Sequence, residues 1–185
     1  MIILVGKSGS GKTSIQEELI KDGKYKRVVT YTTRSMREGE IDGVTYHFIS
    51  SCEFLKKQSE GFFVETTYYD VASGERWFYG TSSECFNDDN SVLIMNPDGI
   101  KAIKGRKDIN YTIFYIMCDN KTLKKRLKKR GDNPKEAKRR LKADKKDFKN
   151  IEALCDYTIM NGDNCTPKDV VGMIDFFYEQ DRRGE

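Results

Sequence analysis

The stretch Gly6-Lys7-Ser8-Gly9-Ser10-Gly11-Lys12-Thr13 decides the fold class of this 185-residue chain. It matches the pattern GxxxxGK[ST], whose glycines let the backbone curl so that several N–H groups face one anion. The apolar run Ile2–Val5 precedes it and predicts a strand buried on both faces. Apolar residues at helical spacing follow it over Thr13–Lys21. A strand, a glycine-rich loop and a helix in this order indicate a nucleoside triphosphate site.

The chemistry of this loop assigns individual roles. The backbone N–H groups and the positive end of the helix dipole would hold phosphate oxygens. Lys12 is predicted to reach the β and γ phosphates, and the Thr13 hydroxyl to bind Mg²⁺. A Gly/Ser-rich turn would match the pattern by chance in about one chain per hundred, and the position between strand and helix makes chance rarer. The loop leaves open which molecule accepts the phosphoryl group.

The rest of the chain alternates strands with helices. Two helix starts have an asparagine or threonine, then proline, then an acidic residue, at Asn133 and Thr166. This alternation predicts an α/β fold with a doubly wound parallel sheet. Further strands are expected at Val28–Thr30, Val92–Met95, Thr112–Met117 and Tyr157–Met160. The last helix is expected to turn five residues toward the core: Val170, Met173, Ile174, Phe177 and Tyr178.

Residues 40–80 have a different pattern. They are rich in Tyr, Phe, Thr and Gly, with short alternating segments and one helical segment at Ser51–Ser59. We expect a small, mostly antiparallel insertion in the parallel sheet.

Composition and charge restrict the function classes. The chain starts without a secretory leader, and no apolar run approaches the roughly 20 residues that span a bilayer, so we expect a cytoplasmic protein. Five dispersed cysteines and one histidine argue against a structural zinc site. Residues 121–149 hold 15 Lys/Arg and four Asp/Glu, a net charge of +11 within a chain of +4. This stretch indicates an anionic partner, and charge alone leaves nucleic acid, membrane headgroups and polyphosphate open.

A candidate acceptor site follows the first strands. Arg34 and Arg37 are three residues apart, and Tyr46 follows them. Two guanidinium groups and a phenol suit a phosphate monoester, because arginine pairs with phosphate oxygens in bidentate fashion.

The pattern TTRxxRxGExxGxxYxF at residues 32–48 resembles guanylate kinases. Further matches follow in the same order over nearly the whole chain, at Phe63–Glu65, Tyr79–Thr81, Leu123–Gly131, Arg139–Leu141 and Asp156–Asn161. The resemblance implies one P-loop NTPase domain over residues 1–185, with a core at 1–30, 82–120 and 150–185. A GMP-binding insertion would occupy 31–81, and a helical lid about 121–149.

The resemblance also implies an activity, the Mg²⁺-dependent transfer of the ATP γ-phosphoryl group to GMP, with dGMP as a further expected acceptor. Glu65 would accept hydrogen bonds from the guanine N1–H and N2–H₂ groups, and the hydroxyls of Thr30 and Thr81 would help to bind the base. Arg34, Arg37 and Tyr46 would bind the acceptor phosphate. By the same resemblance, three arginines of the expected lid would act with Lys12 and Arg34 in phosphoryl transfer: Arg126, Arg130 and Arg140. Asn96 is expected near the acceptor and Asn161 near the ATP.

Three departures from the family pattern accompany the resemblance. Phe78 replaces the first of two tyrosines, which would remove a hydroxyl from the acceptor site unless Tyr68 or Tyr69 supplies it. The segment from Glu65 to Tyr79 is longer than usual. Finally, Ile94 and Asn96 replace two carboxylates, for which Asp98 is a candidate substitute.

Other functions stay open at this point. A kinase of another nucleoside monophosphate would keep the phosphate loop and change the base site. A guanylate-kinase-like binding module would have little need for Lys12 and Thr13. Nucleic-acid binding by residues 121–149 is the weakest alternative, because Phe148 is the one aromatic residue among the charges. We therefore expect ATP and GMP as partners, no nucleic acid or membrane, and a monomer or homodimer.

Overall fold

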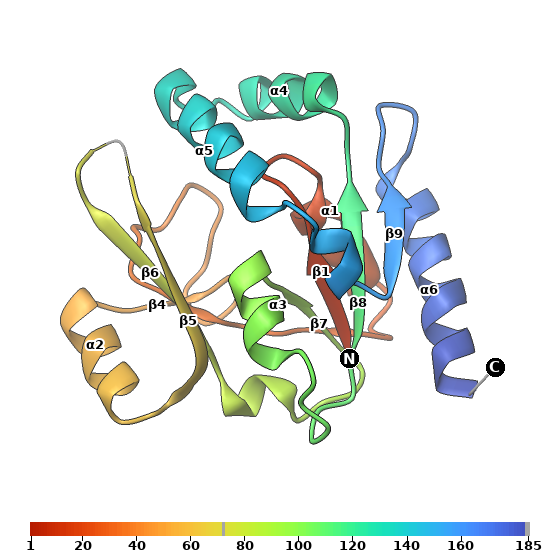
Figure 1. Ribbon diagram of the computed structural model, residues 1–185, viewed down its shortest axis with the longest axis horizontal. Coiled ribbons are helices and arrows are strands. Elements are labelled where there is room, and N and C mark those ends of the chain that lie inside the picture. Colours follow the sequence, from red (N-terminus) through yellow and green to blue (C-terminus); the bar gives the residue numbers. More distant parts are fainter. Residues whose placement is uncertain (72, 184–185) are drawn as a thin grey trace.

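Strand β1 (Ile2–Val5) lies at the centre of a five-stranded parallel sheet in the computed structural model, which describes residues 1–71 and 73–183 (Figure 1). The strand order is β2-β7-β1-β8-β9. The other strands are β2 (Lys26–Arg27), β7 (Ser91–Ile94), β8 (Thr112–Met117) and β9 (Tyr157–Met160). The predicted doubly wound parallel sheet is therefore confirmed.

One predicted strand was wrong. We expected the second strand at Val28–Thr30, but the structure forms it at Lys26–Arg27, which pairs with Ser91 and Val92 of β7. Residues 28–30 instead lead the chain from this sheet to a second one. The high β propensity of Val28 and Val29 favoured a strand at these residues. Which residues form the strand was decided instead by pairing with β7.

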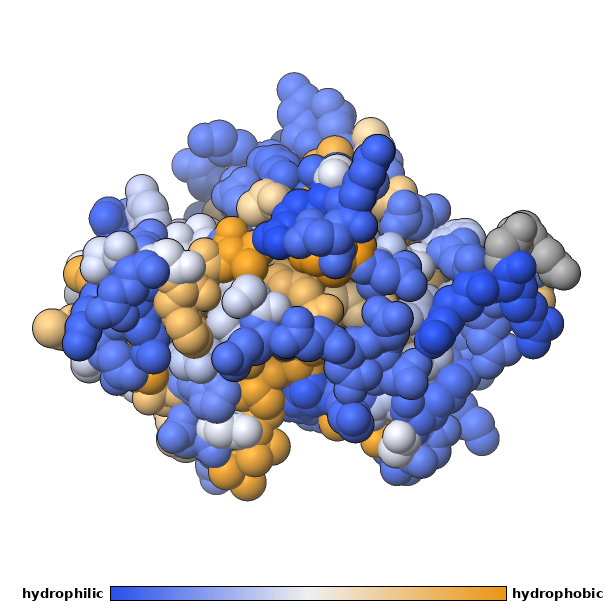
Figure 2. Space-filling model, turned by 90° about the horizontal axis from the view of Figure 1, so that it is seen from below, coloured by the Kyte–Doolittle hydropathy of each residue, from blue (hydrophilic) through white to orange (hydrophobic). Residues whose placement is uncertain are grey.

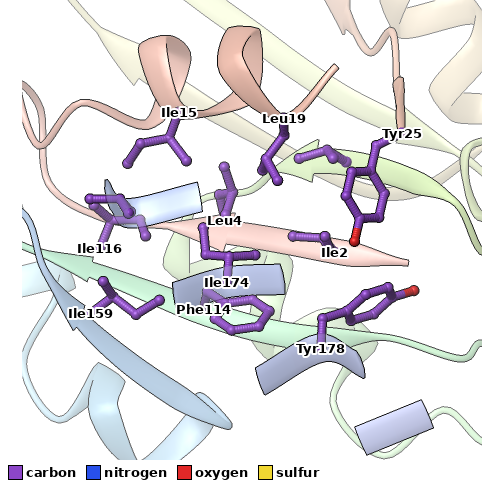
Figure 3. Close-up of a cluster of buried hydrophobic side chains, with 12 residues drawn as sticks. Ile2, Leu4, Ile15, Leu19, Tyr25, Phe114, Ile116, Ile159, Ile174 and Tyr178 are labelled. Atoms are coloured by element: carbon purple, nitrogen blue, oxygen red, sulfur yellow. The ribbon is translucent and has the colours of Figure 1, made fainter. Parts of the chain in front are cut away.

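The central strand packs both of its faces, as its continuous apolar sequence predicts. Ile2 and Leu4 belong to a core cluster with α1 (Lys12–Leu19) and α6 (Pro167–Arg183). Figure 3 shows Ile15 and Leu19 pointing from α1 toward this strand. Ile3 and Val5 face the opposite cluster, formed with α3 (Pro97–Ile103) and the 3₁₀ helix η2 (Ile151–Leu154).

A second sheet of four strands, in the order β4-β3-β6-β5, forms the insertion. Its strands are β3 (Tyr31–Thr32), β4 (His47–Phe48), β5 (Phe63–Asp70) and β6 (Arg76–Ser82), accompanied by α2 (Ser51–Ser59) and the 3₁₀ helix η1 (Ser83–Phe86). β3 runs parallel to β4, and the β3–β6 and β5–β6 pairs are antiparallel. The predicted mostly antiparallel insertion and its helix are confirmed.

Two helices, α4 (Asn120–Lys129) and α5 (Pro134–Asp147), cover the carboxyl ends of β1 and β8 (Figure 1). Asn133 caps α5 as predicted, because its Oδ1 accepts the N–H of Lys135 at 2.9 Å. No side chain of α5 is buried. The side chains of α5 that face the rest of the protein are partly buried instead, among them Arg140, Leu141 and Asp144.

Helix α6 begins as predicted, with reciprocal hydrogen bonds between Thr166 and Asp169. Val170, Ile174 and Tyr178 are buried in the core. Met173 was expected beside them but is 37% exposed, because it lies at the edge of the stripe that faces the sheet.

Hydrophilic side chains cover most of the face seen in Figure 2, and the apolar ones there are divided among small groups. Among the described residues, no helix is long and apolar enough to cross a membrane.

The insertion has a small aromatic core that can be tested separately. Phe54 is fully buried and stacks on Phe63 and Phe78, with ring centroids 4.6 and 5.3 Å away. We expect Phe54→Ala to lower the free energy of unfolding by about 3–5 kcal/mol in urea titrations. Its neighbour Leu55 is 48% exposed, so Leu55→Ala should change stability by less than about 0.5 kcal/mol. Equal effects would contradict this assignment of the core.

Candidate functional site

The phosphate loop curls between β1 and α1 because two of its glycines adopt positive φ angles, 83° at Gly9 and 94° at Gly11. A Cβ on Gly11 would lie 2.5 Å from Nδ2 of Asn161. That amide donates a hydrogen bond to the Ser10 carbonyl at 2.8 Å. Asn161 was expected beside the nucleotide, but it is 5% exposed and instead supports the loop from the end of β9.

Lys12 points back over its own loop. Its Nζ donates to the carbonyls of Gly6 at 2.6 Å and Lys7 at 3.1 Å. Burial lowers the pKa of Lys12 to about 8, while the nearby Asp144 carboxylate raises it and Arg130 lowers it further. The ammonium group therefore loses its charge more easily than an exposed lysine.

A cavity of about 210 Å³ lies between the two sheets and reaches Lys12. We call it the smaller cavity. Several expected acceptor residues line it: Thr30, Tyr46, Glu65, Thr81 and Asn96. Helix α5 and Phe148, which directly follows it, form the other wall; the α5 residues are Arg139, Arg140, Ala143, Asp144 and Asp147.

Glu65 is the distinctive group in this cavity. Its Oε1 accepts a hydrogen bond from the Thr81 hydroxyl at 2.7 Å, whereas its Oε2 is buried and has no hydrogen-bond partner. Burial raises the pKa of Glu65, Thr81 opposes this shift and Asp98 adds to it. A buried carboxylate oxygen without a partner is costly, so it points to a ligand that donates hydrogen bonds. Thr81 thus orients Glu65 directly.

Helix α3 approaches this carboxylate closely. A Cβ on Gly99 would lie 3.3 Å from Cδ of Glu65, so a side chain there would crowd it. Asn96 lines the cavity but caps α3, because its Oδ1 accepts the Gly99 N–H at 2.8 Å. Its oxygen is therefore committed to the helix. Asp98 is exposed and pairs with Lys101 at 2.8 Å, so it does not replace a cavity carboxylate.

The pairing of β5 with β6 sorts their side chains onto two faces. Thr67 pairs with Tyr79 and Tyr69 with Trp77, on the face that carries Glu65. These aromatic residues line the smaller cavity. Trp77 was missed in the sequence, whereas Tyr69 was named there as a substitute hydroxyl and Tyr79 as part of a motif. Counting in steps of two from Glu65 and Thr81 would have placed all three on this face.

Phe78 lies on the opposite face, where it stacks on Phe54. The expected loss of a site hydroxyl at position 78 is therefore wrong, since this side chain points away from the cavity. Tyr68 also lies on that face and is 53% exposed beneath Arg76. Of the two proposed substitutes, Tyr69 lies at the cavity, where burial raises its pKa.

A second cavity of about 940 Å³ extends from the loop toward α4; we call it the larger cavity. Thr13, Arg37, Arg126, Arg130 and Arg140 all line it. Partial burial and the neighbouring guanidinium groups of Arg34 and Arg140 lower the pKa of Arg37. The guanidinium groups therefore repel one another at this cavity, although carboxylates line it as well: Glu17, Glu38, Glu40, Asp132 and Glu136.

Each lid arginine already has a protein partner. Arg126 donates to the Gly162 carbonyl at 2.9 Å and lies 3.4 Å from the Ser10 carbonyl. Nε of Arg130 donates to Asp132 at 2.6 Å. Nε of Arg140 donates to Glu136 at 2.8 Å, which leaves the rest of its guanidinium group for the cavity.

Arg34 differs from the expected direct phosphate ligand. It is 4% exposed, lines neither cavity, and forms a two-pronged ion pair with Glu40. Its guanidinium group lies 5.1 Å from the ring centre of Tyr46. The Glu40 carboxylate also accepts the backbone N–H of Arg37 at 2.7 Å. Arg34 therefore holds Tyr46 and the Arg37 segment in place.

The two cavities share Ser8, Lys12 and Arg140. The smaller cavity contains the hydrogen-bond-accepting carboxylate of Glu65, and the larger is lined by the phosphate loop and three arginines of α4 and α5 or their ends. Anions bound in the two cavities would therefore meet at Lys12 and Arg140.

Comparisons with known proteins agree with this geometry. The family model for guanylate kinase matches residues 1–169. A guanylate kinase from Bdellovibrio bacteriovorus is 33% identical over 87% of this chain and 88% of its own. One from Clostridioides difficile is 33% identical over 94% of this chain and 86% of its own. The crystal structure of guanylate kinase from Anaplasma phagocytophilum shares the fold, with a TM-score of 0.68 at 21% identity over 98% of this chain and 85% of that one.

The family match covers the phosphate loop, the insertion and helices α4 and α5. The relatives cover most of their own length as well. The chain therefore belongs to the guanylate kinase family.

Proposed function

We propose that the smaller cavity binds GMP, or dGMP, through Glu65 and that ATP binds in the larger cavity on the phosphate loop. The observation that carries this assignment is the unpaired, buried Oε2 of Glu65. Guanine presents N1–H and N2–H₂ side by side, and a carboxylate accepts both. Adenine presents an acceptor at N1 instead, which would leave the carboxylate unsatisfied. The reaction would take place in the cytoplasm.

The acceptor phosphate would lie toward the junction of the cavities. Tyr46 and Tyr79 line the smaller cavity, with ring centroids 6.1 Å apart. We assign their hydroxyls and the guanidinium group of Arg37 to this phosphate, with Arg34 as the positioning residue behind Tyr46. Thr30 and Asn96 line the same cavity and complete the acceptor site.

The donor site uses the loop backbone, Lys12 and the arginines. Transfer between two phosphates needs them in line, with their negative charge neutralised and water excluded. Lys12 and Arg140 border both cavities. They are therefore placed to bind the phosphoryl group as it passes from ATP to the acceptor. Arg126 and Arg130 line the donor side. In this proposal residues 121–149 act as the lid and 31–81 as the acceptor-binding insertion.

Mg²⁺ fits the donor set at Thr13. The hydroxyl belongs to an exposed residue that lines the larger cavity. Among the described residues there is no cluster of three or more His, Cys, Asp or Glu side chains that could hold a metal ion. The Ser/Thr hydroxyl at the end of a phosphate loop is a usual Mg²⁺ ligand, beside the substrate phosphates and water, which agrees with this sparse site. When bound, the ion would neutralise charge on the ATP phosphates.

The base assignment is tested by acceptor choice. ADP release would be measured from ATP and Mg²⁺ with GMP, dGMP, AMP, CMP, UMP and dTMP. We expect turnover with the two guanine nucleotides, and a loss of about 10²–10⁴-fold in kcat/KM for GMP in Glu65→Gln. The exposed Glu84 provides a matched control, and Glu84→Gln should act as the wild type. Normal GMP turnover in Glu65→Gln would refute the assignment.

The two faces of β6 allow a paired test of the phosphate site. A hydrogen bond to a charged group contributes about 1.5–3 kcal/mol, so Tyr79→Phe should raise the KM for GMP by about tenfold or more. Phe78→Tyr adds a hydroxyl on the far face and should leave that KM unimproved. A lower KM in Phe78→Tyr would mean that position 78 reaches the acceptor after all.

The pKa of Lys12 gives a pH dependence. Below about pH 8 its Nζ is protonated and attracts phosphates, and above that pH the charge is lost. The Kd for ADP should therefore rise with pH, approaching about tenfold per unit well above pH 8. Calorimetry from pH 7 to 9.5 would measure it. Lys12→Met should bind weakly with a flat profile, and an equal rise in that variant would assign the titration to another group.

A further inference from the structure

Helix α5 presents a carboxylate to the phosphate loop. Asp144 Oδ2 accepts the backbone N–H of Ser8 at 2.7 Å, across 136 positions of sequence. Ser8 belongs to the loop whose N–H groups are expected to hold ATP phosphates. Asp144 therefore joins α5 to the anion-binding backbone of the loop.

The carboxylate also affects the charge at the centre of the site. Asp144 raises the pKa of Lys12 against the larger effect of burial. It thus lies close enough to Lys12 to stabilise the ammonium charge. A carboxylate that takes one loop N–H and faces the loop lysine occupies part of the position of a phosphate group.

We propose that Asp144 acts as an internal anion, which holds α5 on the phosphate loop of the nucleotide-free protein and must leave when the phosphates of ATP arrive. The inference rests on ATP binding at this loop. Two anions cannot share the Ser8 N–H, and the negative phosphates would repel the carboxylate. No α5 side chain is fully buried, so a shift of the helix would expose little core surface as long as Phe148, directly after it, stays stacked on Tyr115.

Release of Asp144 would have a consequence for catalysis. Arg140 lies one helical turn before Asp144 and borders both cavities. A movement of α5 that withdraws Asp144 would also change the position of Arg140 at the phosphates. ATP binding would thereby be coupled to the arrangement of the lid, at the expense of ATP affinity.

The first experiment measures ATP and ADP affinity by calorimetry with Mg²⁺ and without GMP. If the held state makes up about nine-tenths of the free protein, the apparent Kd is about tenfold above the intrinsic value. Asp144→Ala should therefore bind both nucleotides about tenfold more tightly. Asp144→Asn keeps an oxygen that can accept the Ser8 N–H but loses the charge. Its affinities should therefore lie between those of the wild type and of Asp144→Ala.

Asp147 provides the matched control. It lies three residues along α5 and lines the same cavity, but has no hydrogen bond to the loop. Asp147→Asn removes the same charge and should stay within about twofold of wild-type affinity. Equal tightening in Asp147→Asn would overturn the proposal in favour of general charge repulsion. Unchanged or weaker binding in both Asp144 variants would overturn it too.

Hydrogen exchange provides a second readout. In the nucleotide-free wild type, α5 amides should exchange more slowly than in Asp144→Ala, and this difference should vanish once ATP is bound. Faster exchange of the variant in both states would make Asp144 a structural residue only and would overturn the proposal. Failure of the wild type to bind ATP at all would instead refute the donor-site assignment, so the two outcomes are distinguishable.

Discussion

The rest of the site depends on how the phosphate loop is fixed at the end of β1. Gly6 allows the loop to leave the sheet, because a Cβ there would lie 2.6 Å from the Ile116 carbonyl of β8. Asn161 holds the Ser10 carbonyl from the end of β9. The loop is thus held by contacts to β8 and to the residue that follows β9, and its outward N–H groups gain a fixed position. Lys12 and Thr13 are fixed in the same way, because they directly follow the loop as the first two residues of α1.

The insertion brings the second half of the site to this loop. Its sheet has an apolar aromatic side around Phe54 and a polar side around Glu65, and the alternation of one hairpin produces both. The polar side faces α3, where Gly99 leaves room for the carboxylate. The cavity that ends at Lys12 therefore depends on how the insertion packs against the parallel sheet into which it is inserted.

Several arginines of the basic segment 121–149 are paired with carboxylates of the same segment, although its net charge is +11. Glu136 holds Arg139 and Arg140, and the hydrogen bond from Arg139 is the main reason that the pKa of Glu136 falls to about 2. Asp132 holds Arg130 in a similar way. Together with Asp144 at the loop, these carboxylates orient the arginines before any phosphate is present, and preorganised charge is what phosphoryl transfer requires. The family carboxylates missing at Ile94 and Asn96 are thus not restored by Asp98, whereas acidic residues reach the cavity from α5.

The sequence by itself determined the loop, the parallel sheet, the caps of α5 and α6 and the residue types of both sites. These features are local: they follow from glycine conformations, apolar periodicity and capping within a few residues. Only the tertiary structure decided which face of β6 meets the cavity, that Arg34 is taken by Glu40, that Asn96 caps a helix, and that Asp144 reaches Ser8. Each of these depends on a partner chosen by strand register or helix placement. Side chains of equal chemistry, such as Asp98 and Asp144, therefore have different roles because of where the fold places them.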